Sequence, residues 1–222
     1  MRSVMIAILL AAASWAGEPE MARDRQDRSA LEKLAAQAGA APVSDAPANY
    51  RAALVYSYLA EVNEELHDRG GVKRAAEAGI ALAERAVSLK PAVAEYHRVL
   101  GTLYGQIAPV NVLMAISYGK KAQDAIAKAL ELDPKSAQAY VARGVGSYYL
   151  PAGFGGGTDA AIRDFQKAIE LDPKSDEAYI WLGLAMRKTN RNAEARKAFS
   201  RSIDLNPNRT WAKQQLDKTP AN

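Results

Sequence analysis

Residues 129–140 read Ala-Leu-Glu-Leu-Asp-Pro-Lys-Ser-Ala-Gln-Ala-Tyr, and residues 168–179 repeat this stretch as Ala-Ile-Glu-Leu-Asp-Pro-Lys-Ser-Asp-Glu-Ala-Tyr. Weaker copies lie at 86–96 and 202–211. The proline in each copy cannot continue a helix, and the serine two residues later in the two strong copies is a good N-cap for the next one. The stretch therefore marks a boundary between two helices, and its recurrence predicts a helical repeat array.

The prolines of the four copies fix the register of the repeats. They are Pro91, Pro134, Pro173 and Pro207, spaced by 43, 39 and 34 residues. The last spacing is the period of the tetratricopeptide repeat, or TPR. The unit at about 176–209 resembles that family through a set of matching positions: Tyr179, Leu182, Gly183, Met186, Ala195, Phe199 and Pro207. The resemblance implies an all-α protein, a TPR-like α-solenoid of antiparallel helix pairs.

The two preceding units match the TPR pattern at both ends but are longer in the middle. The distance from the glycine to the first alanine of the second helix is 12 residues in the last unit, 17 between Gly144 and Ala161, and 21 between Gly101 and Ala122. These excesses equal the excess proline spacings. We therefore expect both insertions to lie between the two helices of a unit, with each glycine at the helix crossing.

The remaining chain divides into further helical segments. Helical spacing predicts another helix pair at Tyr50–Glu65 and Val72–Leu89, and one amphipathic helix at 21–38. Residues 39–47 are interpreted as a linker, and Thr210–Leu216 as a terminal capping helix. The predicted organisation is a signal peptide at 1–16, an N-terminal helix and linker at 17–46, and the repeat domain at 47–219.

The long unit contains the segment Pro-Ala-Gly-Phe-Gly-Gly at 151–156. This insertion resembles divergent bacterial TPR proteins and the regulator of microtubule dynamics family over about residues 75–210, which implies a binding or adaptor protein. A weaker likeness, based on a signal peptide plus TPR, is to the T-component of TRAP transporters. No lysine follows Gly157, so the glycines predict a turn with positive φ rather than a phosphate loop, with Thr158 or Asp159 capping the next helix.

The first sixteen residues have the features of a secretory signal peptide. A basic start at Arg2 precedes an apolar run, and Ser14-Trp15-Ala16 forms a small-x-small cleavage site. We expect cleavage after Ala16 and a periplasmic or secreted location, with no lipid anchor because the chain has no cysteine. No other stretch approaches the length of a membrane span. An uncleaved anchor and a misassigned start are the alternatives.

Neither catalytic nor metal-binding motifs are found in the sequence. The only two histidines, His67 and His97, are thirty residues apart, and Glu61, Glu64 and Glu65 are interpreted as a solvated helix face. The sequence therefore predicts a protein that is not an enzyme and uses no cofactor. Its 29 basic and 25 acidic residues interleave along the chain, which argues against a nucleic-acid partner.

In TPR proteins the first helix of each unit lines a concave groove. Matching positions place Glu177, Ile180, Leu184 and Arg187 there from the last unit, with the other candidates being Tyr56, Arg98, Thr102, Gln138, Val141, Val145 and Tyr148. We expect a protein or peptide partner, and as an alternative an apolar small ligand in a carrier or a TRAP-type accessory protein. Packing of some of these residues against the inserted loops stays open. The Lys/Asn clamp for chaperone tails is absent.

Overall fold

The computed structural model describes residues 17–39 and 42–221, and the predicted signal peptide lies outside these described residues. The described chain is helical throughout and contains no strand, so the predicted all-α fold is confirmed. The α-helices are α2 Glu18–Asp24, α3 Arg28–Ala38, α4 Ala46–Glu65, α5 Arg69–Leu89, α6 Ala94–Ile107, α7 Ala115–Leu132, α8 Ala137–Tyr149, α9 Thr158–Leu171, α10 Asp176–Lys188, α11 Asn192–Leu205 and α12 Thr210–Asp217. Short 3-10 turns occupy η1 Ala108–Val110, η2 Val112–Met114 and η3 Ala152–Phe154.

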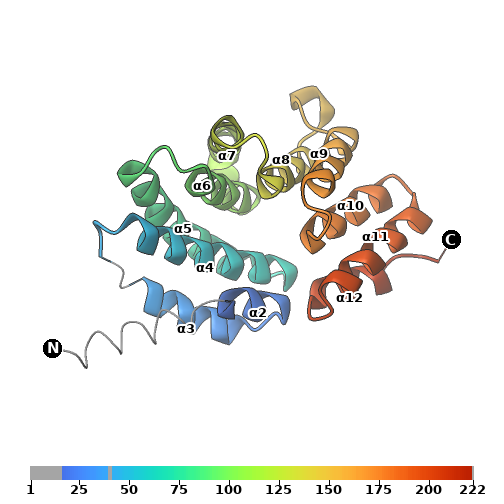
Figure 1. Cartoon of the computed structure of the whole chain (residues 1–222), viewed down its shortest axis with the longest axis horizontal. Coiled ribbons are helices and arrows are strands. Elements are labelled where there is room, and N and C mark those ends of the chain that lie inside the picture. Colours follow the sequence, from blue (N-terminus) through green and yellow to red (C-terminus); the bar gives the residue numbers. More distant parts are fainter. Residues whose placement is uncertain (1–16, 40–41, 222) are drawn as a thin grey trace.

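Four helix pairs stack in series, α4 with α5, α6 with α7, α8 with α9, and α10 with α11 (Figure 1). The array curves strongly, so that α2 at its beginning lies close to α12 at its end (Figure 1). The predicted pair at Tyr50–Glu65 and Val72–Leu89 is confirmed as α4 and α5. The predicted terminal helix is confirmed as α12.

The N-terminal segment forms two helices rather than the single one predicted at 21–38. Gln26 has a φ of 55°, a left-handed conformation that ends α2. The side chain of Asp27 then accepts a hydrogen bond from the backbone N–H of Ala30 and caps α3. The apolar periodicity continued across this break, which is why the sequence pattern alone did not reveal it.

Both insertions lie between the helices of a unit, as predicted. The α8–α9 connection covers residues 150–157, against 189–191 between α10 and α11. The α6–α7 connection at 108–114 absorbs only part of its excess, because α7 has 18 residues where α11 has 14. Gly155 and Gly157 have the predicted positive φ of 82° and 105°. The expected side-chain cap by Thr158 or Asp159 is wrong, since Gly157 is itself the N-cap.

Glycines let the paired helices approach closely. A Cβ built at Gly183 would lie 2.7 Å from the ring of Phe199, and one at Gly144 would lie 2.5 Å from the ring of Phe165. Both phenylalanines are fully buried. The predicted helix crossings at Gly144 and Gly183 are therefore confirmed, and any side chain there would force the pair apart.

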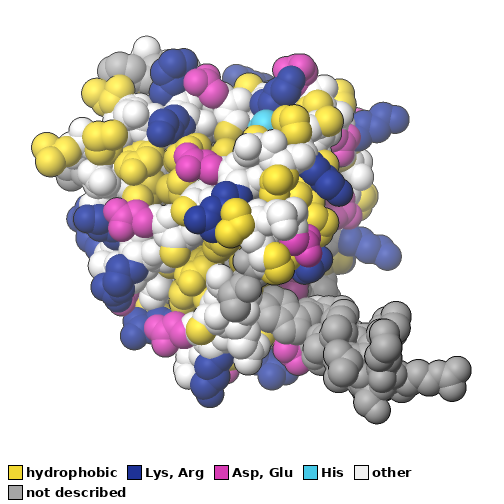
Figure 2. Space-filling model, turned by 90° about the vertical axis from the view of Figure 1, so that its left-hand side faces the viewer, with side chains coloured by type: hydrophobic (Ala, Val, Ile, Leu, Met, Phe, Trp, Pro, Cys, Tyr) yellow, Lys and Arg dark blue, Asp and Glu magenta, His cyan; other side chains and the backbone are white. Residues whose placement is uncertain are grey.

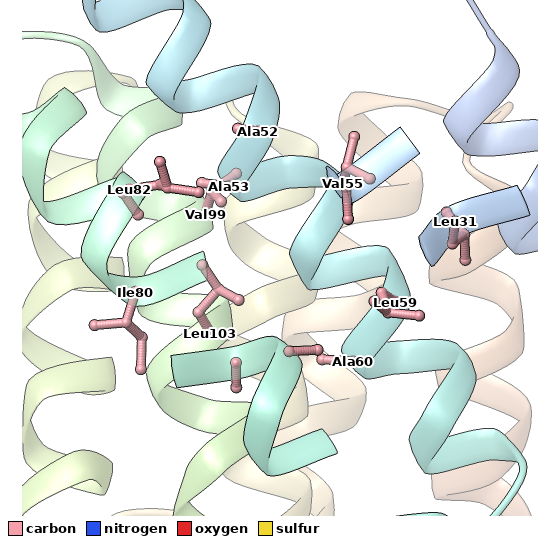
Figure 3. Packing of buried hydrophobic residues seen from close by; sticks show 14 of the residues in the cluster. Leu31, Ala52, Ala53, Val55, Leu59, Ala60, Ile80, Leu82, Val99 and Leu103 are labelled. Atoms are coloured by element: carbon pink, nitrogen blue, oxygen red, sulfur yellow. The ribbon is translucent and has the colours of Figure 1, made fainter. Parts of the chain in front are cut away.

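The buried apolar residues form two main clusters rather than one core. The first is built from α2 to α6, and Figure 3 shows Leu31 of α3 beside Leu59 of α4 at one edge of it. The second is built from α8 to α12. Helix α7 lies between them and buries only Ala125, Ile126 and Ala129. The joint between the α6–α7 and α8–α9 pairs is thus thinly packed.

Polar side chains tie the two ends of the array together. The Arg209 guanidinium, only 1% exposed, donates to Glu61 at 2.6 Å and to Glu65 at 2.5 Å. Asn206 bridges Asp24 and Asp176 at 2.8 and 2.9 Å. We call Arg209, Glu61, Glu65, Asp24 and Asn206 the end clasp. The predicted solvated face is wrong for Glu61 and Glu65, because the curvature of the array brings α12 against α4.

Charged side chains surround the surface that Figure 2 shows, with Lys and Arg interspersed among Asp and Glu. Basic and acidic groups alternate over this face and do not gather into a patch of one sign (Figure 2). This mixed surface agrees with the interleaving of the 29 basic and 25 acidic residues along the chain.

We predict that Gly183→Ala destabilises the fold by about 1–3 kcal/mol, because the added methyl group overpacks the contact with Phe199. Chemical denaturation of the purified protein measures this change. Gly105→Ala is the matched control, since a Cβ at this helical glycine meets nothing within 4 Å. The control should be neutral or slightly stabilising. Equal behaviour of the two variants would contradict the crossing-point role of Gly183.

We predict that Arg209→Met destabilises the fold at pH 7 by about 3–5 kcal/mol, because it leaves the Glu61 and Glu65 carboxylates without their buried cation. Denaturant midpoints give the change. Adding Glu61→Gln and Glu65→Gln to Arg209→Met removes both charges and should restore most of the loss. A loss below about 1 kcal/mol in the single variant, the size of a surface ion pair, would show that the clasp is not a buried network.

Candidate binding cavity

A cavity of about 920 Å³ opens on the inner face of the curved array. We call it the central cavity. The first helices of the four pairs contribute to it, together with one face each of α7 and α9 and the side chain of Arg23 from α2. Its lining includes Ser57, Tyr58, Glu61 and Glu64 of α4, Arg98, Thr102 and Gln106 of α6, Ala122 and Ile126 of α7, Gln138, Val141, Val145 and Tyr149 of α8, Arg163 and Asp164 of α9, and Glu177 and Trp181 of α10.

The structure brings six of the eleven predicted groove residues together in the central cavity. They are Arg98, Thr102, Gln138, Val141, Val145 and Glu177. They come from α6, α8 and α10, the helices that the TPR pattern assigns to the concave face. Their role in binding stays a prediction.

The other five predicted groove residues lie outside the cavity lining. Ile180 and Leu184 are buried in the second core cluster. Arg187 donates to the backbone and side chain of Gln215 and to Thr219, at 2.7–3.2 Å. Tyr148 packs against Trp181, with the Lys188 ammonium 4.2 Å from its ring centroid, and Tyr56 packs against the first core. The C-terminal segment thus occupies the part of the groove that α10 would otherwise expose.

Sequence reasoning missed the contribution of α4 to the cavity. Ser57, Glu61 and Glu64 line it at helical spacing i, i+4 and i+7, which places them on one face of α4. Fixing the register of the first repeat would have found this face. Arg23 had no comparable signal, because it reaches the cavity only through the curvature of the whole array.

The arginines of the cavity have carboxylate partners. Arg98 makes two hydrogen bonds to Glu95, at 2.5 and 2.7 Å. Arg143 makes two to Asp164, at 2.7 and 3.0 Å. Arg23 makes two to its neighbour Asp24, at 2.8 and 3.1 Å. Such charge-assisted pairs hold the guanidinium groups in place.

Two carboxylates of the cavity are less well neutralised. Glu64 accepts one hydrogen bond, 3.3 Å long, from the Tyr149 hydroxyl. The Glu177 carboxylate lies 4.0 Å from Arg23, beyond hydrogen-bonding distance. Burial raises the pKa of both carboxyl groups, and the nearby Glu61 carboxylate raises them further. This side of the cavity therefore has unfilled capacity for positive charge.

Aromatic rings border this acidic side. The Trp181 ring centroid lies 6.2 Å from that of Tyr149 and 5.4 Å from that of Trp211, in edge-to-face geometry. Tyr58 lies under the Arg23 guanidinium, at 4.9 Å from its ring centroid. The cavity thus combines small apolar walls with an aromatic and carboxylate end.

Other kinds of site were sought in the described ranges. Within residues 17–39 and 42–221, no group of three or more His, Cys, Asp or Glu side chains is placed to hold a metal ion. The ring of His97 contacts the backbone carbonyl of Pro91 at 2.8 Å. None of the helices in these ranges combines the length and the apolar character that crossing a membrane requires.

Solved structures share this architecture. A thermophilic TPR protein of Thermus thermophilus, TTC0263, is 16% identical, with a TM-score of 0.60 over 96% of this chain and 95% of that one. Pseudomonas aeruginosa pilF is 19% identical, with a TM-score of 0.49 over 77% and 68%. A MamA protein is 23% identical, with a TM-score of 0.44 over 74% and 78%. The first of these supports the TPR fold.

Family models divide the chain between them. A tetratricopeptide repeat model matches residues 152–210, and TPR folds commonly serve as protein-interaction scaffolds. No curated protein sequence matches the chain significantly. The model described as regulator of microtubule dynamics protein 1-3 matches residues 19–150, which is more than half of the chain. The chain belongs to the regulator of microtubule dynamics protein 1-3 family.

Proposed function

We propose that this protein is a non-enzymatic, exported scaffold that holds a segment of a protein partner in the central cavity. The observation that carries the proposal is the cavity itself, which gathers residues from the first helix of all four pairs on one inner surface. Scaffolds of this fold present such surfaces to peptides.

The lining supports a peptide rather than a flat protein surface as the occupant. Val141, Val145 and Ile126 offer apolar contact, while Gln138, Thr102 and Gln106 offer hydrogen-bonding groups. A peptide backbone needs both kinds of partner when it leaves water. The volume of about 920 Å³ lies near the upper end of the range of about 300–1,000 Å³ for ligand pockets, which suits a short segment.

A small-molecule carrier is the second candidate, and the end clasp favours it. Contacts between residues 144 and 148 positions apart draw α12 against α4 and narrow the access to the cavity. A closed array suits a ligand that must be shielded from water. A ligand that survives purification, found by native mass spectrometry, would support this candidate over the first.

Export is supported by the sequence of residues 1–16, with its basic start, apolar run and small-x-small site. In the described part of the chain, the first helix begins only at Glu18, after the proposed cleavage point. Removal of the segment would therefore leave the described helices intact.

We predict that a photocrosslinking residue at Thr102 forms an adduct with the partner in the native envelope, because Thr102 lines the cavity. The same residue at Gln166, which is exposed on α9 outside the cavity lining, is the control. Filling the cavity with Val145→Trp should abolish the Thr102 adduct while leaving the helical circular dichroism unchanged. An adduct that survives Val145→Trp would contradict binding in the cavity.

We also predict that the protein isolated from its native cells begins at Gly17, because signal peptidase cuts after Ala16. Intact-mass measurement of the purified protein identifies the terminus. Ala16→Leu removes the small residue that cleavage requires and should leave the precursor uncleaved. Recovery of native protein that starts at Met1 would contradict export by this route.

A further inference from the structure

Three glycines inside helices have no packing reason to be glycine. They are Gly105 on α6, Gly119 on α7 and Gly146 on α8, and a Cβ built on any of them meets nothing within 4 Å. Glycine weakens a helix interior relative to alanine, so such positions need another explanation. All three line the central cavity.

The helix-crossing glycines differ clearly from these three. At Gly101, Gly144 and Gly183 a Cβ would lie within 2.5–2.7 Å of a neighbouring Ile or Phe side chain. Close helix packing accounts for them. The three open glycines, which we call the glycine wall, instead leave bare backbone on the side of the cavity, and bare backbone permits the close approach of a ligand.

The charges of the cavity point to the sign of that ligand. Arg98, Arg143 and Arg23 each have a carboxylate partner that accepts two hydrogen bonds, and Glu61 is held by Arg209. Among the described residues, Glu64 and Glu177 have no cation within hydrogen-bonding distance. Arg163 is the other charged residue of the lining, and it is exposed on α9.

The neighbours of these carboxylates also suit a cation. Tyr149 contacts Glu64 through its hydroxyl, and the Trp181 ring lies against that of Tyr149. Both rings line the cavity. The faces of tryptophan and tyrosine attract ammonium and guanidinium groups, so rings and carboxylates act in the same direction.

We propose that the central cavity takes a partner segment with basic side chains, lysine or arginine, that pair with Glu64 and Glu177 while the segment's backbone lies against the glycine wall. This inference rests on the proposed function, because it assumes a peptide occupant. It adds the chemistry of recognition. Acidic segments are disfavoured, since they would bring further negative charge to buried carboxylates.

The test begins with the peptides that the full-length protein retains from a random library of capped heptapeptides. Lysine and arginine should be enriched. The best lysine peptide should bind about tenfold more tightly than its acetyl-lysine counterpart, because acetylation removes a charged hydrogen-bonding partner. Glu64→Gln with Glu177→Gln should abolish that ratio. Glu131→Gln, at an exposed carboxylate outside the cavity, should preserve it.

The glycine wall has an independent readout with opposite signs. Gly146→Ala should raise the midpoint of thermal unfolding by about 2 °C, because alanine favours the helix and meets no neighbour. Gly146→Leu should weaken binding of the selected peptide at least about tenfold while the protein stays folded. A Gly146→Leu variant that binds as well as the wild type would overturn the wall.

Three outcomes overturn the inference. They are retention of no peptide, enrichment without basic residues, and a lysine preference that persists without both carboxylates. If the Thr102 crosslink forms but basic residues are not enriched, the recognition chemistry is wrong and the scaffold function stands. If neither the crosslink nor any retained peptide is found, both fail.

Discussion

The fold depends on the close approach of paired helices at a glycine. Where Gly144 meets Phe165 and Gly183 meets Phe199, the absence of a side chain on one helix lets a whole ring fit on the other. This contact sets the distance within a pair, and the pair is the unit that stacks. Stacking with a constant turn then produces the curvature that encloses the cavity. A local steric constraint thereby determines the global shape.

The sequence was informative wherever the interactions are local. The proline register, the Ser136 and Ser175 caps and the crossing glycines act within one unit, so the helix pairs and the place of the insertions could be predicted. The break at Gln26 and the added length of α7 were missed, because apolar periodicity continues through both. Local pattern does not separate a long helix from a long loop.

The cavity was predictable only in part, for a related reason. Arg98, Thr102, Gln138, Val141, Val145 and Glu177 line it because their helices follow the repeat. Ile180, Leu184 and Arg187 follow the repeat too, but the C-terminal segment and the second core occupy their face. The burial of Glu65 could not be read from its own charged neighbourhood, since Arg209 is 144 residues away. Such contacts depend on the cumulative angle of every preceding pair.

The divided core has a consequence for cooperativity. Since each half buries its own apolar cluster and α7 joins them thinly, the halves behave as two foldons with separate opening energies. Flexing at the α7 joint changes the width between them without unfolding either. The ionic contacts between α4 and α12 join the same two halves from the other side, so they oppose this flexing. Occupancy of the interior is thereby coupled mechanically to the integrity of the termini.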